Sequence, residues 1–144
     1  MLADGYQHQN KIDAAIQEYE NVLKDNDNNV PALNNLAWLY FQRNDPKAKA
    51  LAQKANSLMP DRPEIQDTYG WILVNQDDVA RGLELLRKAA GAAPNSPEIA
   101  YHLAAGLAKS GSRDEARSSL EKILKDYKEF PERGAAEALL KQLQ

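Results

Sequence analysis

The sequence repeats itself about every 34 residues, and this period constrains the fold more than any other feature. One set of anchors consists of paired small residues, and a second set consists of prolines. The small pairs are Ala37 with Ala48, Gly70 with Gly82, and Ala104 with Ala116, and the prolines are Pro60, Pro94 and Pro131. Self-similarity at this period is typical of a stacked array of similar units. A single globule built around one active site is not expected.

Each repeat has the pattern of two helices. In the first repeat, Ala15, Tyr19, Val22 and Leu23 follow the i, i+4, i+7, i+8 spacing of an apolar helical stripe. No segment alternates apolar and polar residues over the length of a strand, so we predict an all-α chain of about nine helices. The small anchors are expected where the two helices of a repeat cross, since a large side chain there would force the pair apart.

The anchors divide the chain into one domain of stacked repeats. Residues 1–29 form a partial repeat, with a stub of its first helix near residues 2–6 and its second helix at 12–23. Full repeats span 30–62, 63–96 and 97–132, and residues 133–144 are expected to form a capping helix over the last open edge. Because the first repeat is incomplete, we expect the chain to be a piece of a longer repeat protein, possessing an open N-terminal edge suited to self-association.

Local signals mark the helix ends. Residues 112–115 read Ser-Arg-Asp-Glu, the pattern of a capping box, and Asp45-Pro46 and Ser96-Pro97 each join a cap acceptor to a proline in the first turn. Asn44 and Gly111 suit the left-handed turn inside a helical hairpin. We therefore expect tight turns at these two positions.

Composition excludes several classes of function. The net charge is −3, acids and bases are interleaved, and no block of basic residues suggests a nucleic-acid partner. The chain has no cysteine, which rules out disulfides and thiolate metal sites. No apolar run reaches the ~18 residues of a membrane span, and no signal peptide is recognisable at the start.

The repeat anchors resemble the tetratricopeptide repeat (TPR) family. The pattern of an apolar residue, a Leu-Gly or Leu-Ala pair, a second pair of small residues and a closing proline covers essentially the whole chain. The resemblance implies a right-handed superhelix of stacked helical hairpins, with a concave groove lined by the first helix of each repeat. It also implies a non-catalytic scaffold that binds a protein or peptide segment in that groove, without a cofactor.

A narrower resemblance points to one bacterial group. Residues 36–40, 67–73, 82–89 and 98–104 are similar to the C-terminal repeats of TPR lipoproteins from PEP-CTERM/exosortase systems, which accompany exopolysaccharide export. This resemblance implies a periplasmic parent protein attached to the outer membrane, and without it we expect a cytoplasmic location. It also raises an alternative function, the binding of a polysaccharide.

The helical period assigns a set of side chains to the expected groove. They are Asn34, Asn35, Trp38 and Phe41 of the second repeat, Asp67, Thr68, Trp71 and Asn75 of the third, and Tyr101, His102 and Lys109 of the fourth. Trp38 and Trp71 occupy equivalent positions, so together with Tyr101 they predict an aromatic stripe. Aromatic side chains anchor many interfaces, but the same indoles could instead pack against a neighbouring helix.

Catalytic and metal-binding patterns are missing from the sequence. His8 and His102 have no partner at ligand spacing, so we expect polar surface or groove residues and no metal site. Asp77-Asp78 is interpreted as a helix start, where acids favour the helix dipole. No phosphate-binding loop or nucleophile motif is present, and we expect the protein not to be an enzyme.

Overall fold

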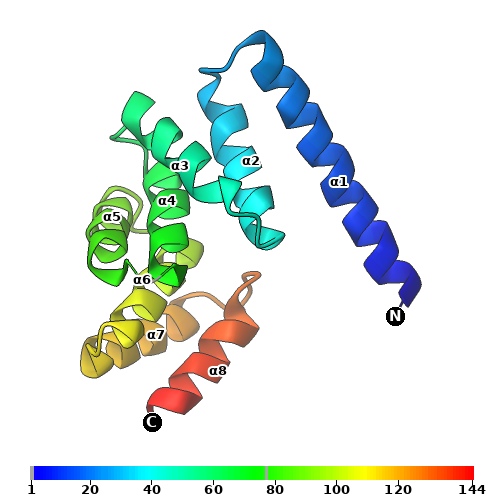
Figure 1. The fold of residues 1–144 in the computed structure, drawn as a ribbon. Helices are drawn as coiled ribbons and strands as arrows, with labels where there is room; N and C mark the ends of the chain where they lie inside the picture. The colour runs from blue at the N-terminus through cyan, green and yellow to red at the C-terminus, as the bar shows by residue number, and fades with distance from the viewer. Residues whose placement is uncertain (1, 77) are drawn as a thin grey trace. The chain divides into compact units, whose positions relative to one another are not determined.

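The computed structural model describes residues 2–76 and 78–144, with side chains from residue 9 onward, and over this part of the chain it contains eight α-helices and no strand (Figure 1). The helices are α1 (Leu2–Asp25), α2 (Val30–Gln42), α3 (Lys47–Leu58), α4 (Pro63–Asn75), α5 (Val79–Ala92), α6 (Pro97–Lys109), α7 (Arg113–Asp126) and α8 (Arg133–Leu143). The predicted all-α fold is confirmed. No helix within the described residues combines the length and the apolar character that crossing a bilayer requires.

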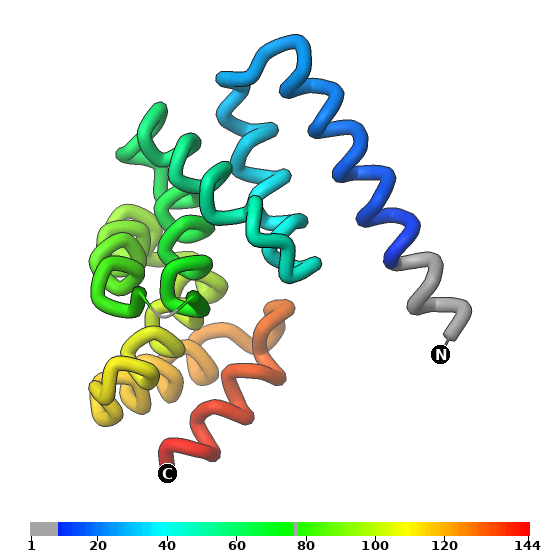
Figure 2. The backbone as a smooth tube through the Cα atoms, viewed as in Figure 1, coloured from blue at the N-terminus to red at the C-terminus, as the bar shows by residue number. Residues whose placement is uncertain are grey.

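The helices group into two compact units. Met1–Asp61 contains α1 to α3, and Arg62–Gln144 contains α4 to α8. Within the second unit, α4 packs on α5, α5 on α6, α6 on α7, and α7 on α8, so that successive hairpins stack (Figure 2). Within the first unit, α2 packs on both α1 and α3.

Small residues allow the two helices of a hairpin to cross closely. A Cβ added at Gly70 would lie 3.0 Å from the carbonyl oxygen of Gly82, and one added at Gly82 would lie 2.7 Å from that of Gly70. The corresponding alanines of the other two hairpins, Ala37 with Ala48 and Ala104 with Ala116, are fully buried. The prediction that these anchors mark the crossings is therefore confirmed.

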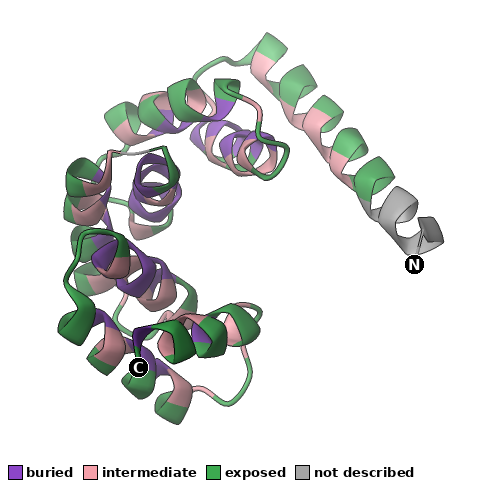
Figure 3. Ribbon diagram, turned by 60° about the horizontal axis from the view of Figure 1, so that its bottom comes forward, coloured by how far each residue is buried: buried purple, intermediate pink, exposed green. Residues whose placement is uncertain are grey.

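The core of each unit lies between its helices, where the buried residues face one another (Figure 3). In the second unit, Leu107 and Leu120 are completely buried beside Ala104 and Ala116. The last helix joins the same cluster through Ala136, and Leu139 and Leu140 pack against it. Helix α8 therefore covers the open face of the last hairpin, as a capping helix does.

Turn and cap geometry follows the local signals with one exception. Asn44 and Gly111 have φ angles of 57° and 91°. Ser96 Oγ accepts a hydrogen bond from the Ile99 backbone N–H at 3.2 Å, and Asp45 Oδ1 accepts one from that of Lys47 at 2.9 Å. The capping box predicted at 112–115 is wrong, because the side chain of Ser112 caps no backbone group and Glu115 instead pairs with an arginine of α5.

The first helix differs from its predicted form. Residues 2–25 form one continuous helix, whereas a stub and a separate second helix were predicted, so the described residues hold eight helices and not nine. No proline interrupts this stretch, and the single Gly5 costs only about 1 kcal/mol in a helix interior. None of the side chains at 9–25 is buried, and Val22 is 39% exposed.

Candidate functional site

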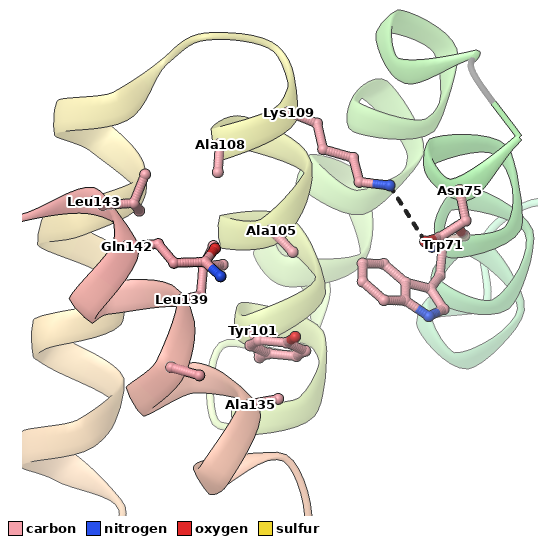
Figure 4. A pocket seen from close by; sticks show the side chains of 11 residues that line it. Trp71, Asn75, Tyr101, Ala105, Ala108, Lys109, Ala135, Leu139, Gln142 and Leu143 are labelled. Carbon is pink, nitrogen blue, oxygen red and sulfur yellow. Dashed lines mark hydrogen bonds between the residues drawn. The ribbon is translucent and has the colours of Figure 1, made fainter.

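An open groove of about 670 Å³ lies on the second unit between α4, α6 and α8 (Figure 4). Its lining is largely apolar and consists of Trp71, Asn75, Tyr101, Ala105, Ala108, Lys109, Ala135, Ala138, Leu139, Gln142 and Leu143. Small side chains on α6 and α8 leave the space open, and larger ones stand at its sides. A volume in this range is typical of ligand sites in proteins, which span about 300–1,000 Å³.

Two aromatic rings are among the side chains that line this groove. The ring centroids of Trp71 on α4 and Tyr101 on α6 are 6.1 Å apart, at an interplanar angle of 53°. Both side chains are partly exposed, which leaves ring surface available to a ligand. Burial raises the pKa of the Tyr101 hydroxyl, and the charge of Glu132 raises it further, so the phenol stays neutral near neutral pH.

A polar pair stands at one end of the groove. Lys109 Nζ donates a hydrogen bond of 3.4 Å to Asn75 Oδ1 (Figure 4). Asn75 Nδ2 donates one of 2.8 Å to the Trp71 carbonyl oxygen. Lys109 carries the one full charge among the lining residues. This end can therefore bind an anionic or carbonyl group of a ligand, to which the Lys109 ammonium would donate.

A buried pair of ionisable residues, Asp67 on α4 and His102 on α6, lies beside Trp71. His102 Nδ1 lies 2.7 Å from Asp67 Oδ1, and the two residues are only 2% and 6% exposed. The Trp71 ring stacks on the His102 ring, with centroids 4.2 Å apart and an interplanar angle of 21°. The Asp67–His102 pair thus fixes one face of the indole, while Tyr101 borders it elsewhere.

Glu98 extends this buried pair into an acidic cluster. It lies one helical turn before His102 on α6, and its donor oxygen is within 4.8 Å of the donors of Asp67 and His102. Desolvation raises the pKa of the Glu98 carboxyl, and the charges of Glu132 and Asp67 add to the increase.

The structure brings together part of the predicted groove set. Trp71, Asn75, Tyr101 and Lys109 line the groove. Asp67 and His102, expected on the groove surface, are instead buried beside it. Thr68 is also buried, and its hydroxyl donates to the Glu64 carbonyl oxygen at 3.0 Å within the same helix.

The predicted residues of the second repeat belong to the first unit. Trp38 and Phe41 contact each other there, with ring centroids 6.0 Å apart. Asn35 donates to the Tyr19 hydroxyl at 3.3 Å, and Asn34 Oδ1 is buried without a hydrogen-bond partner within the described residues. Whether either tryptophan touches a ligand stays a prediction.

Helix α8 and Glu98 contribute to the site, although neither is among the groove residues predicted from the sequence. Leu139 and Leu143 were assigned to capping alone, although their i, i+4 spacing also allows one edge of the stripe to face a groove. Glu98 and His102 are also four residues apart on α6, and this spacing alone places both side chains on one face of the helix. The side chains of His8 and Asp77 lie outside the described residues.

Comparison with known proteins agrees with this architecture. The model of the tetratricopeptide repeat family matches residues 6–72 and 73–143. Cellulose synthase 1 operon protein C of Komagataeibacter xylinus is 32% identical over 133 residues, which are 86% of this chain, and the chain spans 10% of the length of that relative.

Two solved structures share the fold. PilW, described as a type IV pilus biogenesis factor, has a TM-score of 0.76 and 26% identity over 98% of this chain and 68% of its own. PilF of Pseudomonas aeruginosa has a TM-score of 0.77 and 19% identity over 99% of this chain and 64% of its own. With helical hairpins that cross at paired small residues, a capping helix and a family match over nearly its whole length, the chain belongs to the tetratricopeptide repeat family.

Proposed function

We propose that this chain is a non-catalytic protein-interaction scaffold, and that the groove between α4, α6 and α8 binds a segment of a partner protein. The tetratricopeptide fold is in general a scaffold for protein–protein interaction. The observation that carries the more specific proposal is the partly exposed pair of rings, Trp71 and Tyr101, beside an open apolar groove.

The chemistry of the groove indicates what kind of segment would fit. Its alanines and leucines favour an apolar side chain laid between α6 and α8, and the two rings favour an aliphatic or aromatic anchor. Lys109 would bind a carbonyl or carboxylate at the end of the segment, in the place that Asn75 Oδ1 now occupies. The expected ligand is therefore an apolar peptide with an acceptor at one end.

Trp71 is the expected energetic centre of this contact. Its ring stacks on that of the buried His102, which holds one face of the indole. A side chain that is already ordered loses little entropy when a ligand binds. Truncation of such an aromatic anchor typically costs at least about 2 kcal/mol, or about 30-fold in affinity.

A peptide-display selection against the immobilised chain tests this proposal, with affinities of the selected peptides measured by fluorescence anisotropy. Trp71→Ala should weaken binding about 30-fold. Ala138→Glu should also weaken it, because Ala138 is exposed and lines the groove. Ala80→Glu is the matched control, since Ala80 is an exposed alanine on α5 outside the groove lining. Peptides that bind all three variants equally would exclude the groove as the binding site.

The aromatic pair of the first unit is proposed as a separate partner contact. Trp38 and Phe41 lie one helical turn apart on α2, and both are partly exposed. Asn34 and Asn35 stand on the preceding turn, and the exposed Asn35 would supply hydrogen bonds to a peptide backbone. Trp38→Ala in the same anisotropy assay measures this contribution independently of Trp71.

Polysaccharide binding is the second candidate function. It is supported by the resemblance to a protein named for a cellulose synthase operon, and by the flat rings of Trp71 and Tyr101, which would suit a sugar ring. Titration of soluble cello-oligosaccharides against tryptophan fluorescence tests it. Absence of any change at millimolar sugar, in protein that still binds a selected peptide, would eliminate this function.

Self-association through α1 is a further proposal. Helix α1 has no buried side chain between residues 9 and 25, and Val22 is 39% exposed. A second copy would cover this helix as a neighbouring repeat does in an array. Light scattering should then give a mass above that of the monomer, and Val22→Lys should reduce it. A monomeric mass at high protein concentration would exclude self-association.

A further inference from the structure

Three potential metal ligands meet where α4 packs against α6. Asp67 on α4, and Glu98 and His102 on α6, place their donor atoms within 4.8 Å of one another. Asp67 and His102 are buried, whereas Glu98 is exposed to solvent. The cluster therefore has a protected side, formed by the buried pair, and an open side through which an ion can enter.

We propose that Asp67, Glu98 and His102 bind a divalent transition-metal ion, with zinc as the representative of its class. One imidazole and two carboxylates suit zinc and its neighbours, whereas calcium and magnesium favour sites made of oxygen ligands. Three protein ligands leave one position of a tetrahedral ion for water. The metal site adjoins the groove through the stacked Trp71 and His102 rings, but its three ligands do not line the groove. Metal binding does not depend on the proposed partner binding.

The geometry requires little rearrangement. His102 Nδ1 and Asp67 Oδ1 are 2.7 Å apart. Two ligands of a tetrahedral zinc with bonds of about 2.0 Å lie about 3.3 Å apart, so the ion can take the place of the shared proton after a small separation. Glu98 lies one helical turn from His102, so both side chains lie on one face of α6.

The charge of the cluster also favours a cation. Two carboxylates accompany a single imidazole, and the charge of Glu132 acts on Glu98 as well. Oε2 of Glu132 is buried without a hydrogen-bond partner within the described part of the chain. A divalent ion would offset the repulsion among these acids, which burial strengthens.

The sequence alone predicts no metal site at these residues. Asp67 and His102 are 35 positions apart, so no local spacing connects them. They meet because α4 and α6 are the first helices of consecutive hairpins and pack against each other. Equivalent turns of the two helices are thereby brought side by side.

Trp71 supplies a direct readout, because its ring is stacked on that of His102. The experiment uses the full chain with Trp38→Phe, which leaves Trp71 as the remaining tryptophan. Titration with Co²⁺ should produce the visible absorption of a low-coordinate cobalt site and quench Trp71 fluorescence. Zinc should reverse both signals by displacing cobalt.

A pair of matched variants separates this site from adventitious binding. Glu98→Gln removes an exposed ligand without touching the core, and it should weaken cobalt affinity by at least about tenfold. Glu64→Gln is the control, because Glu64 is an exposed acid at the equivalent first turn of α4. The cobalt affinity of this variant should be unchanged. Circular dichroism verifies that both variants are folded.

A second ligand variant, Asp67→Asn, keeps the side-chain size and should weaken cobalt binding to a similar extent in folded protein. The proposal is overturned if millimolar cobalt produces neither absorption nor quenching. It is also overturned if Glu98→Gln and Glu64→Gln bind cobalt with equal affinity. Because Glu98→Gln is expected to fold normally, its result decides the question even if Asp67→Asn does not fold.

Discussion

Replacing Gly82 with alanine should destabilise the second unit by forcing α4 and α5 apart. A Cβ at this position would lie 2.7 Å from the Gly70 carbonyl oxygen, 2.7 Å from Val74 Cγ2 and 2.9 Å from the Val74 backbone nitrogen. Two of these three atoms belong to the backbone, so a rotamer change cannot relieve the contact. The helices themselves must separate, and overpacking of this kind typically costs about 1–3 kcal/mol.

The same substitution has a favourable component that must be subtracted. Alanine is better than glycine in a helix interior by up to about 1 kcal/mol. Gly91 is a matched control, since it lies in the same helix and a Cβ there would meet nothing within 4 Å. We expect Gly91→Ala to be neutral or to stabilise by up to about 1 kcal/mol. The difference between the two variants then isolates the overpacking cost of about 1–3 kcal/mol.

Urea unfolding followed by circular dichroism measures both variants. We expect the midpoint of Gly82→Ala to fall and that of Gly91→Ala to stay or rise, with similar m-values. The reasoning is refuted if the two variants are equally stable. That result would mean that α4 and α5 can move apart freely, to a separation that paired alanines tolerate in the neighbouring hairpins.

Three further predictions concern single positions. The pKa of the Glu98 carboxyl is raised above 4.5, so its contribution to stability is complete below that value and is lost as pH rises through the raised pKa. In the presence of a chelator, Glu98→Gln should therefore raise the unfolding midpoint at pH 7 but not at pH 4. Equal effects of Glu98→Gln at the two pH values would contradict the raised pKa. Asn44→Val places a β-branched residue at φ 57°, which should cost about 1–2 kcal/mol in thermal or urea unfolding, whereas Asn44→Gly should not. Leu120→Ala removes a fully buried side chain and should cost about 2–5 kcal/mol by urea unfolding, and a loss below 1 kcal/mol would show that the core of the second unit collapses around the cavity.

Features governed by local physics could be predicted from the sequence. The left-handed turns at Asn44 and Gly111 follow from the few residue types that accept positive φ. The crossings at Gly70 with Gly82, and at the equivalent alanines, follow from the rule that close helices require small residues. The family resemblance adds the stacking order, which local signals alone do not contain.

Features that depend on competition between partners could not be predicted reliably. Ser112 and Glu115 have the spacing of a capping box, but Glu115 forms a two-point contact with Arg87 instead, with N–O distances of 3.0 and 3.2 Å. The first helix continues through the expected break because no residue there opposes helix strongly enough. The helical phase of α6 places His102 in the groove, whereas the structure buries it against Asp67 of the preceding hairpin.

The buried pair of Asp67 and His102 has a consequence for how the array assembles. Apolar surfaces of look-alike hairpins are nearly interchangeable, so such chains are prone to pair in shifted register or with the hairpin of another copy. At the equivalent positions of the second repeat stand Asn34 and Asn35, which cannot replace an acid and an imidazole. A shifted pairing would separate these two buried ionisable groups, at a cost of about 3–5 kcal/mol. One polar contact thus makes the pairing of α4 with α6 specific among helices of similar sequence.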